Sequence, residues 1–415
     1  MKPPTKQPLA HCILSASILI IAAAGMISTA TAEIVSLRDF AGGYDDGSYP
    51  WGSLTPSGST LYGMTRKGGS NNCGVIFKMD TAGNNYTNLH KFVGGYYDGR
   101  QPFGDLTLSG STLYGMTYYG GISDFGVIFK MEIDGSNYTN LHKFANGNDD
   151  GKWPYGFLTL SGSTLYGMTS GGGDGNHGFI FKIETDGSDY TTLHEFVAGS
   201  NDGSRPKGSL TLFGSTLYGM TRQGGSNSCG VIFKMNVDGS SYTNLHKFVG
   251  GNDDGQNPEG SLSLSGSTLY GMTYSGGINN YGVIFRMDTD GSSYTNLHKF
   301  TGVPNDGSRP LGSLSLFGGT LYGMTYNGGI NNDGVIFRMD TNGSYYAKLH
   351  DFAGGSGDGS QPYYGALVEG DGNYYGMTRS GGSNDIGVVF MLVPEPTVFV
   401  FALIAVGVLL KVRGV

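Results

Sequence analysis

The sequence predicts an all-β fold, a seven-bladed β-propeller of four-stranded blades closed by an N-terminal strand, and three observations support this prediction. First, the pentapeptide LYGMT starts at Leu61 and returns every 52 residues up to Leu321, and a seventh copy, YYGMT, starts one residue late at Tyr374. A fixed period near 50 residues indicates one supersecondary unit repeated along the chain. Second, glycine makes up 74 of the 415 residues although the apolar content is ordinary, which fits short strands joined by tight turns. Third, no long amphipathic helical pattern occurs between residues 33 and 392.

Each repeat contains four short runs rich in Leu, Val, Ile, Tyr, Phe and Thr and bounded by Gly, Ser or Asp, which is the pattern of strands joined by hairpins. In the second repeat these runs cover residues 104–108, 112–118, 126–131 and 138–144. By analogy with WD40-type propellers, we expect the first run to lie innermost and the fourth outermost. Gly63 and its copies lie within the second run, where glycine usually marks a close backbone approach. We expect that approach to occur between blades.

The numbers of copies indicate how the repeats close. The Gly-Val-Ile-Phe run occurs seven times, whereas the Leu-His-x-Phe run occurs six times and its seventh copy, residues 37–40, precedes the first repeat. The chain therefore begins with an outermost strand and ends at Phe390 without one. We expect the strand at residues 34–40 to complete the seventh sheet and to close residues 33–392 into a ring with short, protected edges. The alternative is an open β-solenoid, which needs no such offset and exposes two end edges.

Cys73 and Cys229 occupy the same position in two repeats that lie three periods apart. Two cysteines in an exported protein would ordinarily suggest a disulfide. A ring of seven blades places them nearly opposite each other, whereas a disulfide needs Cα atoms about 4.4–6.8 Å apart. We therefore predict that they do not pair within the chain.

The N-terminal segment, residues 1–32, is predicted to be a secretory signal peptide. Lys2 and Lys6 form a basic start, an apolar run covers residues 13–26, and residues 30–32 (Ala-Thr-Ala) supply the small residues of a cleavage site after Ala32. An uncleaved membrane anchor is the alternative. The short apolar run and the Ala-x-Ala site favour cleavage.

The C-terminal segment, residues 393–415, is predicted to be a second targeting signal. The motif Val393-Pro394-Glu395-Pro396 precedes an apolar run over residues 397–410, which is followed by Lys411 and Arg413. The apolar run is short for a membrane helix, which needs about 20 residues. The segment resembles the PEP-CTERM sorting signal, which implies recognition by an exosortase, a membrane transpeptidase of Gram-negative bacteria, and removal of the tail. A plain C-terminal anchor is the alternative. Either interpretation implies an exported chain that contacts the membrane only through this segment, and then a location at the cell surface or in the medium.

The charge of the chain argues against nucleic acid as a partner. Without Lys2, Lys6, Lys411 and Arg413, 21 basic residues face 33 acidic ones, so the mature domain carries a net charge near −12. A strongly acidic surface repels phosphate backbones.

The repeat itself resembles the GloVer tandem repeat, a family of surface proteins with variable anchoring tails. The resemblance rests on a Leu-Tyr-Gly-x-Thr run, a Gly-Gly pair and a Gly-x-x-Phe run, which here are residues 61–65, 68–69 and 74–77. These motifs recur through residues 34–392. The resemblance implies a surface protein and brings no established activity with it.

The acidic residues and histidines that could carry chemistry repeat with the ring. An Asp-Gly-x-x-Pro loop precedes each first run, and its aspartates are Asp46, Asp98, Asp150, Asp202, Asp254, Asp306 and Asp358. Seven carboxylates could suggest Ca²⁺ sites, but each loop supplies one firm carboxylate, and Asp and Gly more simply form a turn. Six histidines share a position on the outermost strands: His90, His142, His194, His246, His298 and His350. They lie too far apart around a ring to share one metal ion, so we expect each to pack beside the phenylalanine two residues later, and we predict no metal or other cofactor.

The candidate ligand-binding residues are those that fail to repeat. The residue after the loop proline is, in order, Trp51, Phe103, Tyr155, Lys207, Glu259, Leu311 and Tyr363. The residue before the Gly-Val-Ile-Phe run also varies from repeat to repeat, and both positions should lie on one face of the ring. Our hypothesis is that a ligand contacts this face through the four aromatic residues, with Lys207 and Glu259 adding polarity, because aromatic rings offer rigid contact area. The alternative is that these aromatic residues plug the mouth of the ring as core.

Two classes of function follow from these observations. The first is a non-catalytic binding or structural module of the cell surface or extracellular matrix, with an extracellular polysaccharide or a surface protein as partner. The resemblance, the sorting tail and the absence of an acid–base constellation in the sequence favour this class. The second is a propeller enzyme that acts on extracellular carbohydrate.

Overall fold

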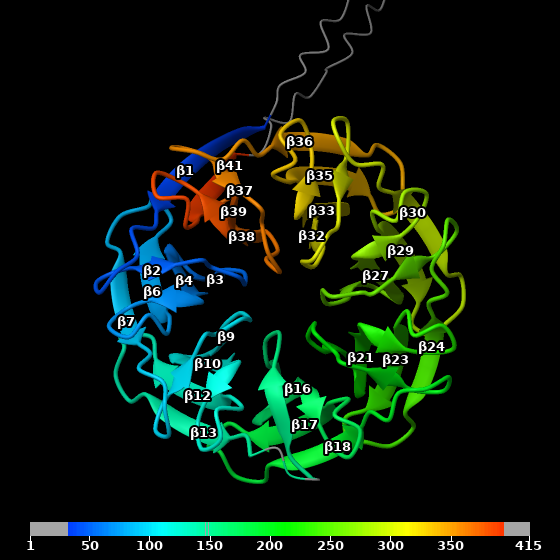
Figure 1. Cartoon of the computed structure of the whole chain (residues 1–415), viewed down its shortest axis with the longest axis horizontal. Coiled ribbons are helices and arrows are strands. Elements are labelled where there is room, and N and C mark those ends of the chain that lie inside the picture. The colour runs from blue at the N-terminus through cyan, green and yellow to red at the C-terminus, as the bar shows by residue number, and fades with distance from the viewer. Residues whose placement is uncertain (1–31, 146, 148, 394–415) are drawn as a thin grey trace, which may run out of the picture. The chain divides into compact units, whose positions relative to one another are not determined.

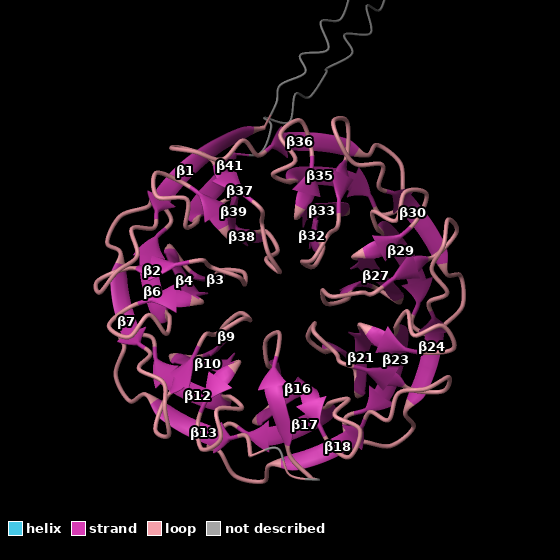
Figure 2. Ribbon diagram, in the orientation of Figure 1, coloured by secondary structure: helices cyan, strands magenta, loops and turns pink. Residues whose placement is uncertain are grey.

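The computed structural model describes residues 32–145, 147 and 149–393, which form 41 strands and no helix. Residues 1–31 of the predicted signal peptide (residues 1–32) and Pro394, Glu395 and Pro396 of the predicted sorting motif lie outside the described residues. The strands build seven four-stranded antiparallel blades around a central axis, which confirms the predicted propeller (Figures 1 and 2). No helix within the described ranges is long and apolar enough to cross a membrane.

Within a blade the four strands pair in chain order from the axis to the rim, as in β3-β4-β6-β7. The innermost strands are β3 (Thr55–Ser57), β9 (Thr107–Ser109), β15 (Thr159–Ser161), β20 (Thr211–Phe213), β26 (Ser263–Ser265), β32 (Ser315–Phe317) and β38 (Val368–Gly370). The second strands are β4 (Thr60–Thr65), β10 (Thr112–Thr117), β16 (Thr164–Gly172), β21 (Thr216–Thr221), β27 (Thr268–Thr273), β33 (Thr320–Thr325) and β39 (Asn373–Thr378). The expectation that the first run lies innermost is therefore confirmed.

The outer half of each blade comes from the third and fourth runs. The third strands are β6 (Val75–Asp80), β12 (Val127–Glu132), β17 (Phe179–Glu184), β23 (Val231–Asn236), β29 (Val283–Asp288), β35 (Val335–Asp340) and β41 (Val388–Val393). The outermost strands are β7 (Thr87–Lys91), β13 (Thr139–Lys143), β18 (Thr191–Glu195), β24 (Thr243–Lys247), β30 (Thr295–Lys299), β36 (Ala347–Asp351) and β1 (Glu33–Asp39).

Each loop that leads into a blade also forms a short ribbon with the loop after the second strand. Six of these ribbons are two-residue pairs: β2 (Gly47–Ser48) with β5 (Lys67–Gly68), β8 (Gly99–Arg100) with β11 (Tyr119–Gly120), β19 (Gly203–Ser204) with β22 (Gln223–Gly224), β25 (Gly255–Gln256) with β28 (Ser275–Gly276), β31 (Gly307–Ser308) with β34 (Asn327–Gly328), and β37 (Gly359–Ser360) with β40 (Ser380–Gly381). In the third blade β14 (Gly151–Pro154) pairs directly with β16. The ribbons hold the loops of one face in a fixed arrangement.

The N-terminal strand closes the ring. β1 pairs antiparallel with β41, from Glu33 opposite Val393 to Asp39 opposite Val388, and so completes the seventh blade. Val393, which the sequence suggested for the sorting motif, is thus the last residue of a blade strand. The Asp39 carboxylate also accepts hydrogen bonds from the backbone and side chain of Ser383, which joins the two ends of the propeller a second time.

The core lies between blades rather than within them. Successive side chains of a strand point to opposite faces, so Tyr62 and Met64 of the first blade pack on Leu113 and Phe129 of the second. The same contact recurs at every junction, including the one where Met377 of the seventh blade meets the first. Because a single blade cannot bury either of its own faces, the stability of each blade depends on its neighbours in the ring.

The expected role of Gly63 was wrong. A Cβ atom at Gly63 would lie 2.5 Å from Cζ of Phe77, which is the residue opposite Gly63 on the neighbouring strand of the same blade. Glycine therefore makes room for a phenylalanine ring within the blade and not for the backbone of another blade. Phe77 is fully buried as a result.

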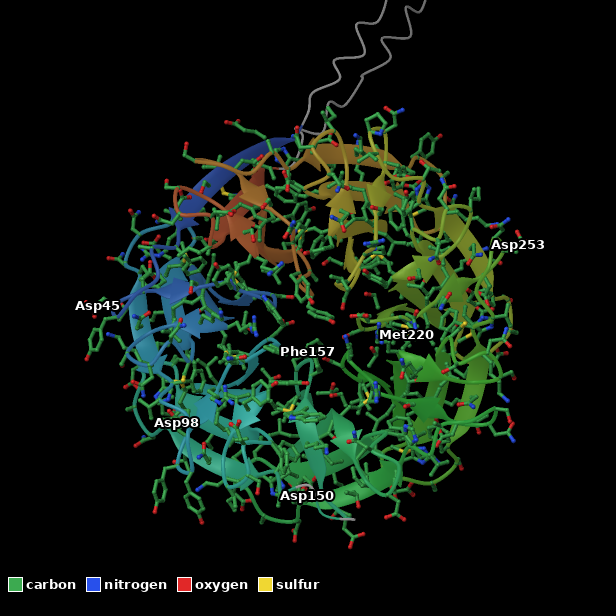
Figure 3. All side chains as sticks on the ribbon, in the orientation of Figure 1. Asp45, Asp98, Asp150, Phe157, Met220 and Asp253 are labelled. Atoms are coloured by element: carbon green, nitrogen blue, oxygen red, sulfur yellow. The ribbon has the colours of Figure 1, made fainter. Side chains whose placement is uncertain are left out.

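The repeated histidines and loop aspartates form one unit at the rim of the ring, where Figure 3 shows Asp98 and Asp150. His194 packs beside Phe196, as predicted, and its ring stacks on Tyr242 of the next blade with centroids 3.8 Å apart. Its Nε2 atom lies 3.2 Å from the Asp202 carboxylate. Asp202 also accepts hydrogen bonds from the backbone N–H groups of Val197 and Gly203, so the turn interpretation of the Asp-Gly loops is confirmed. The pairing of histidine with aspartate was not predicted.

Arg38 shows that this unit accepts a different side chain. In the first copy its guanidinium lies over the Tyr86 ring at 3.5 Å and its Nη2 atom is 2.8 Å from Asp46. Arginine thus makes the stacking and the aspartate contact that histidine makes elsewhere. Each unit fastens an outer strand to the next blade.

The two cysteines of the propeller, Cys73 and Cys229, are free thiols. The prediction that they do not pair within the chain is confirmed, because they lie in blades that are three positions apart in the ring. Each Sγ atom instead lies 3.4 Å from a backbone carbonyl oxygen two residues earlier.

We predict that His194→Ala lowers the free energy of unfolding by about 1–3 kcal/mol at pH 7, because the Asp202 carboxylate loses a buried partner. Burial alone would raise the pKa of Asp202, but the hydrogen bonds from His194 and Val197 outweigh it and hold the pKa below its usual value. The contribution of the Asp202 carboxylate to the free energy of unfolding is therefore present above about pH 4 and is lost as the carboxylate takes up its proton at lower pH. Denaturant unfolding of His194→Arg is the matched control, since Arg38 shows the substitution fits; an equal loss in both variants would contradict the prediction.

Candidate functional site

Seven glycines form a ring around the axis at which each blade touches the next, one or two residues after the variable residue of each loop. They are Gly52, Gly104, Gly156, Gly208, Gly260, Gly312 and Gly365. A Cβ atom at Gly208 would lie 2.2 Å from the carbonyl oxygen of Gly260, and the other members show the same conflict with the next glycine around the ring. The close approach between blades that was expected at Gly63 therefore occurs here.

The next residue of each repeat forms a second ring, which we call the polar ring because five of its seven members are polar. Its members are Ser53, Asp105, Phe157, Ser209, Ser261, Ser313 and Ala366. The backbone N–H of Ser209 donates to Oγ of Ser261 at 2.8 Å, and the N–H of Ala366 donates to Oγ of Ser53 at 2.9 Å across the closing junction. Phe157 occupies the ring at the centre of the propeller (Figure 3). Side chains of this ring thus satisfy backbone donors of the preceding blade.

Asp105 is the one carboxylate in this polar ring. Its Oδ1 atom accepts a short hydrogen bond from the backbone N–H of Ser53. Burial among the blades raises the pKa of Asp105 to about 6, against the lowering effect of that bond. Asp105 was not among the residues predicted from the sequence, although it stands where four other copies carry serine.

The predicted ligand-binding residues meet at the mouth of the channel, where they form a plug. The Trp51 ring lies 4.4 Å from Phe103 and 4.5 Å from Tyr363 between centroids, and Phe103 lies 5.1 Å from Tyr155. Lys207 Nζ is 3.1 Å from Glu259 Oε2. We call Trp51, Phe103, Tyr155, Lys207, Glu259, Leu311, Tyr363 and Tyr364 the mouth plug. All six predicted residues belong to it.

Tyr364 is the member of the plug that was not predicted from the sequence. It is the extra residue that makes the seventh repeat late, and it adopts a left-handed backbone conformation with φ of 58°. Its hydroxyl group bonds to Glu259 and lies 3.1 Å from Lys207 Nζ. One inserted residue thus reaches across the mouth to the opposite blades, and the late seventh copy was its signal in the sequence.

The burial of the plug favours the core interpretation for some of its members. Trp51, Phe103 and Glu259 are 9%, 5% and 4% exposed, so they offer little surface to a ligand, and their ligand contacts stay a prediction. Tyr155, Lys207 and Tyr363 are half-buried, so part of each side chain stays accessible. The space between the plug and the polar ring measures about 20 Å³, which holds one water molecule and not an organic ligand.

A ring of seven residues, six of them large, surrounds the plug on the outer face. The residue after each LYGMT run supplies it: Arg66, Tyr118, Ser170, Arg222, Tyr274, Tyr326 and Arg379. The Arg66 guanidinium lies over the Trp51 ring at 4.3 Å, Tyr118 stacks on Phe103 at 4.5 Å, and Arg222 Nε is 2.7 Å from Glu259 Oε1. The plug and this outer ring together make a surface of aromatic and cationic groups.

The charge balance within the plug rests on Glu259. Its carboxylate contacts both Lys207 and Arg222, and such a buried acid depends on its partners for compensation. Burial lowers the pKa of the Lys207 ammonium, although Glu259 beside it favours the charged form. The three groups hold one another in place at the edge of the mouth.

A sequence profile of the Gloeobacter/Verrucomicrobia repeat matches the chain three times, over residues 25–160, 141–318 and 301–405. The chain belongs to this repeat family. The finding agrees with the resemblance seen in the repeat motifs and, like that resemblance, assigns no reaction. No curated protein matches this repeat protein.

Solved structures share its fold at low sequence identity. An oligogalacturonate lyase in complex with manganese is 13% identical, with a TM-score of 0.55, and covers 88% of this chain and 95% of its own. The oligogalacturonate lyase from Vibrio parahaemolyticus is also 13% identical, with a TM-score of 0.54, and covers 89% of this chain and 95% of its own. Likeness at this level shows the propeller fold alone. Among the described residues of this repeat protein, no group of three or more His, Cys, Asp or Glu side chains is placed to hold a metal ion.

We predict that Asp105→Ser stabilises the protein at pH 8 by about 1–2 kcal/mol, because the raised pKa means that the folded state disfavours the ionised carboxylate. Because the pKa of Asp105 is raised, ionisation of its carboxylate costs the folded protein stability as the pH rises through about 6. The stability gained from Asp105→Ser should therefore vanish below about pH 4. Unfolding curves at the two pH values measure both. Ser209→Asp, the reverse change at an equivalent site, should destabilise at pH 8; a gain from Asp105→Ser that is equal at both pH values would contradict the explanation.

Proposed function

We propose that this Gloeobacter/Verrucomicrobia repeat protein is a non-catalytic binding module displayed outside the cell, and that its ligand lies on the face of the mouth plug. One observation carries the proposal. On this face the seven equivalent positions of the plug and of the outer ring differ from blade to blade, and aromatic and cationic residues dominate both sets. The opposite face carries short, uniform turns such as Ser57 to Ser59. Loops on a rigid scaffold are where binding residues usually lie.

The plug determines how a ligand can be held. Since the mouth is closed by side chains in mutual contact, a ligand lies on the face and does not pass into the channel. The short ribbons between loops, such as β8 with β11, hold this face in a fixed arrangement. A rigid surface loses little conformational entropy on binding, which suits a module that recognises an extended surface ligand.

The terminal segments support display outside the cell. The predicted signal peptide and the PEP-CTERM-like tail would export the chain and bring it to an exosortase-type sorting enzyme. The resemblance to the repeat family also implies a surface protein, which agrees with export of the chain.

An enzyme acting on extracellular carbohydrate is the second candidate, and its specific support is the fold likeness to the oligogalacturonate lyases. The described residues contain one serine–histidine contact on this face, with His177 Nδ1 2.8 Å from Ser204 Oγ. Ser204 is 2% exposed, so its hydroxyl group cannot reach a polymeric substrate. The binding module is therefore the better-supported function.

We expect the purified protein to bind members of a glycan array and to leave the same polysaccharides intact in turnover assays. The reason is that the face offers contact groups, whereas the hydroxyl group of its serine–histidine contact is buried at Ser204. Retention on the array, together with product analysis by chromatography over time, measures both. Shortened or unsaturated products would favour the enzyme instead.

We also expect Trp51→Ala and Tyr155→Ala to act differently. Trp51 is buried between Phe103 and Tyr363, so its loss should lower the free energy of unfolding by about 3–5 kcal/mol. Tyr155 stays partly accessible, so its loss should weaken ligand binding by about 1–3 kcal/mol. Unfolding curves and titrations on the folded fraction separate the two effects, and unchanged affinity after Tyr155→Ala would remove Tyr155 from the contact surface.

A further inference from the structure

The face of the mouth plug is hollowed beside the plug, over the second, third and fourth blades. The hollow has a volume of about 310 Å³ and is lined by Tyr118, Trp153, Tyr155, Ser170, Asn176, Arg205, Lys207 and Arg222. We call it the side pocket. Its volume falls at the lower end of the range of small-molecule sites, which suits a short stretch of a polymer.

The side pocket exists because one residue of the outer ring is small. The six other copies carry arginine or tyrosine where the third blade carries Ser170. The Ser170 hydroxyl group donates to the backbone carbonyl of Trp153 at 2.9 Å and so stays close to the backbone. The space that a larger side chain fills in other blades is therefore open between Tyr118 and Arg222.

One wall of the side pocket is aromatic. Tyr118 and Trp153 are nearly parallel, with an interplanar angle of 15° and centroids 6.1 Å apart, and Tyr155 meets Tyr118 edge-on at 5.0 Å. Trp153 adopts φ of 58°, the conformation that every copy shows at this position, so the turn and not the tryptophan sets its direction. Such a wall offers flat apolar area to the C–H face of a sugar ring.

The other wall is cationic. Arg222 binds Glu259 through Nε and Lys207 bonds to Glu259 and Tyr364, so two of the three cations are held in position by the plug. Arg205 is exposed, and no acidic side chain of the described residues contacts it. Three cations against one carboxylate leave an excess of positive charge in a chain whose net charge is −8. A cleft of one sign concentrates ligands of the other.

We infer that the side pocket binds an acidic saccharide, with a uronate carboxylate on Arg205 and its neighbouring cations and the sugar ring on the wall of Tyr118, Trp153 and Tyr155. This inference rests on the proposed function and names its ligand class. Arginine pairs with carboxylates through two parallel hydrogen bonds, and the aromatic wall adds the contact that an acidic peptide or a simple anion would not use. The acidic surface elsewhere disfavours nucleic acid.

Two substitutions test the pocket with residues that the fold already accepts. Ser170→Tyr places in the third blade the residue that stands at Tyr118, Tyr274 and Tyr326, and it should fill the pocket. Arg205→Gln places there the residue that stands at Gln101 and Gln361, with φ of 54° and 53° against 53° for Arg205, and it should remove the exposed cation. Arg309→Gln is the matched control, because Arg309 holds the same position in the sixth blade and does not line the side pocket.

The measurement is calorimetric titration of the full protein and its variants with a galacturonate oligomer, a neutral galactose oligomer of equal length and a glutamate peptide. We expect binding of the galacturonate oligomer alone, an affinity at least tenfold weaker for Ser170→Tyr and Arg205→Gln, and no change for Arg309→Gln. Melting temperatures of all variants report whether the fold is retained.

Several results would overturn the inference. Equal binding of the neutral oligomer or of the glutamate peptide would remove the acidic saccharide as the ligand class. An unchanged affinity in Ser170→Tyr would place the site elsewhere. The galacturonate oligomer could fail to bind while Ser170→Tyr still binds members of the glycan array. That result would support the proposed binding function and contradict its assignment to this pocket.

Discussion

The contact between seven glycines around the axis is the constraint on which the rest of the propeller depends. At this level the backbone of each blade lies against the backbone of the next, and a Cβ atom on any of the seven would lie 2.9 Å or less from a backbone atom of the next blade. The contact sets how closely the blades approach one another, because each glycine meets its neighbour and Gly365 returns to Gly52. It also separates two environments that are one residue apart in sequence. The residue before each glycine points into the plug, and the residue after it joins the polar ring.

The rim complements this inner contact. There a histidine or arginine from one blade contacts a loop aspartate and stacks on a tyrosine of the next blade, as His90, Asp98 and Tyr138 do. Between the rim and the axis lies the same apolar cluster at each junction. Strand positions are therefore occupied on both faces in every blade, and they cannot vary without a cost in packing. Variation is left to the loops of one face and to a few turns, which explains why the plug and the outer ring hold the residues that differ.

Much of this architecture was predictable because the repeat exposes it directly. The number of blades, the order of strands and the closure by residues 34–40 all follow from counting copies. The residue that contacts Gly63 could not be predicted in this way. A repeated glycine indicates a close contact, but the repeat does not show which residue makes it. The histidine–aspartate pairing shows a fixed offset of eight residues in the sequence, yet the offset has meaning only after the chain turns back at the rim. For Tyr364 the late seventh copy reveals an insertion, whereas the direction of its side chain depends on the left-handed turn.

The side pocket shows how a ring of equivalent blades can carry one distinct site. Seven identical blades would present the same surface seven times. Two of the departures from this equivalence lie beside Lys207: Tyr364 adds a residue that crosses the mouth, and Ser170 leaves the outer ring without a large side chain. Lys207 connects the two, because its Nζ atom bonds to Tyr364 while its side chain lines the pocket. The plug therefore does more than close the channel, since it holds the Lys207 and Arg222 side chains of the pocket in place through Glu259.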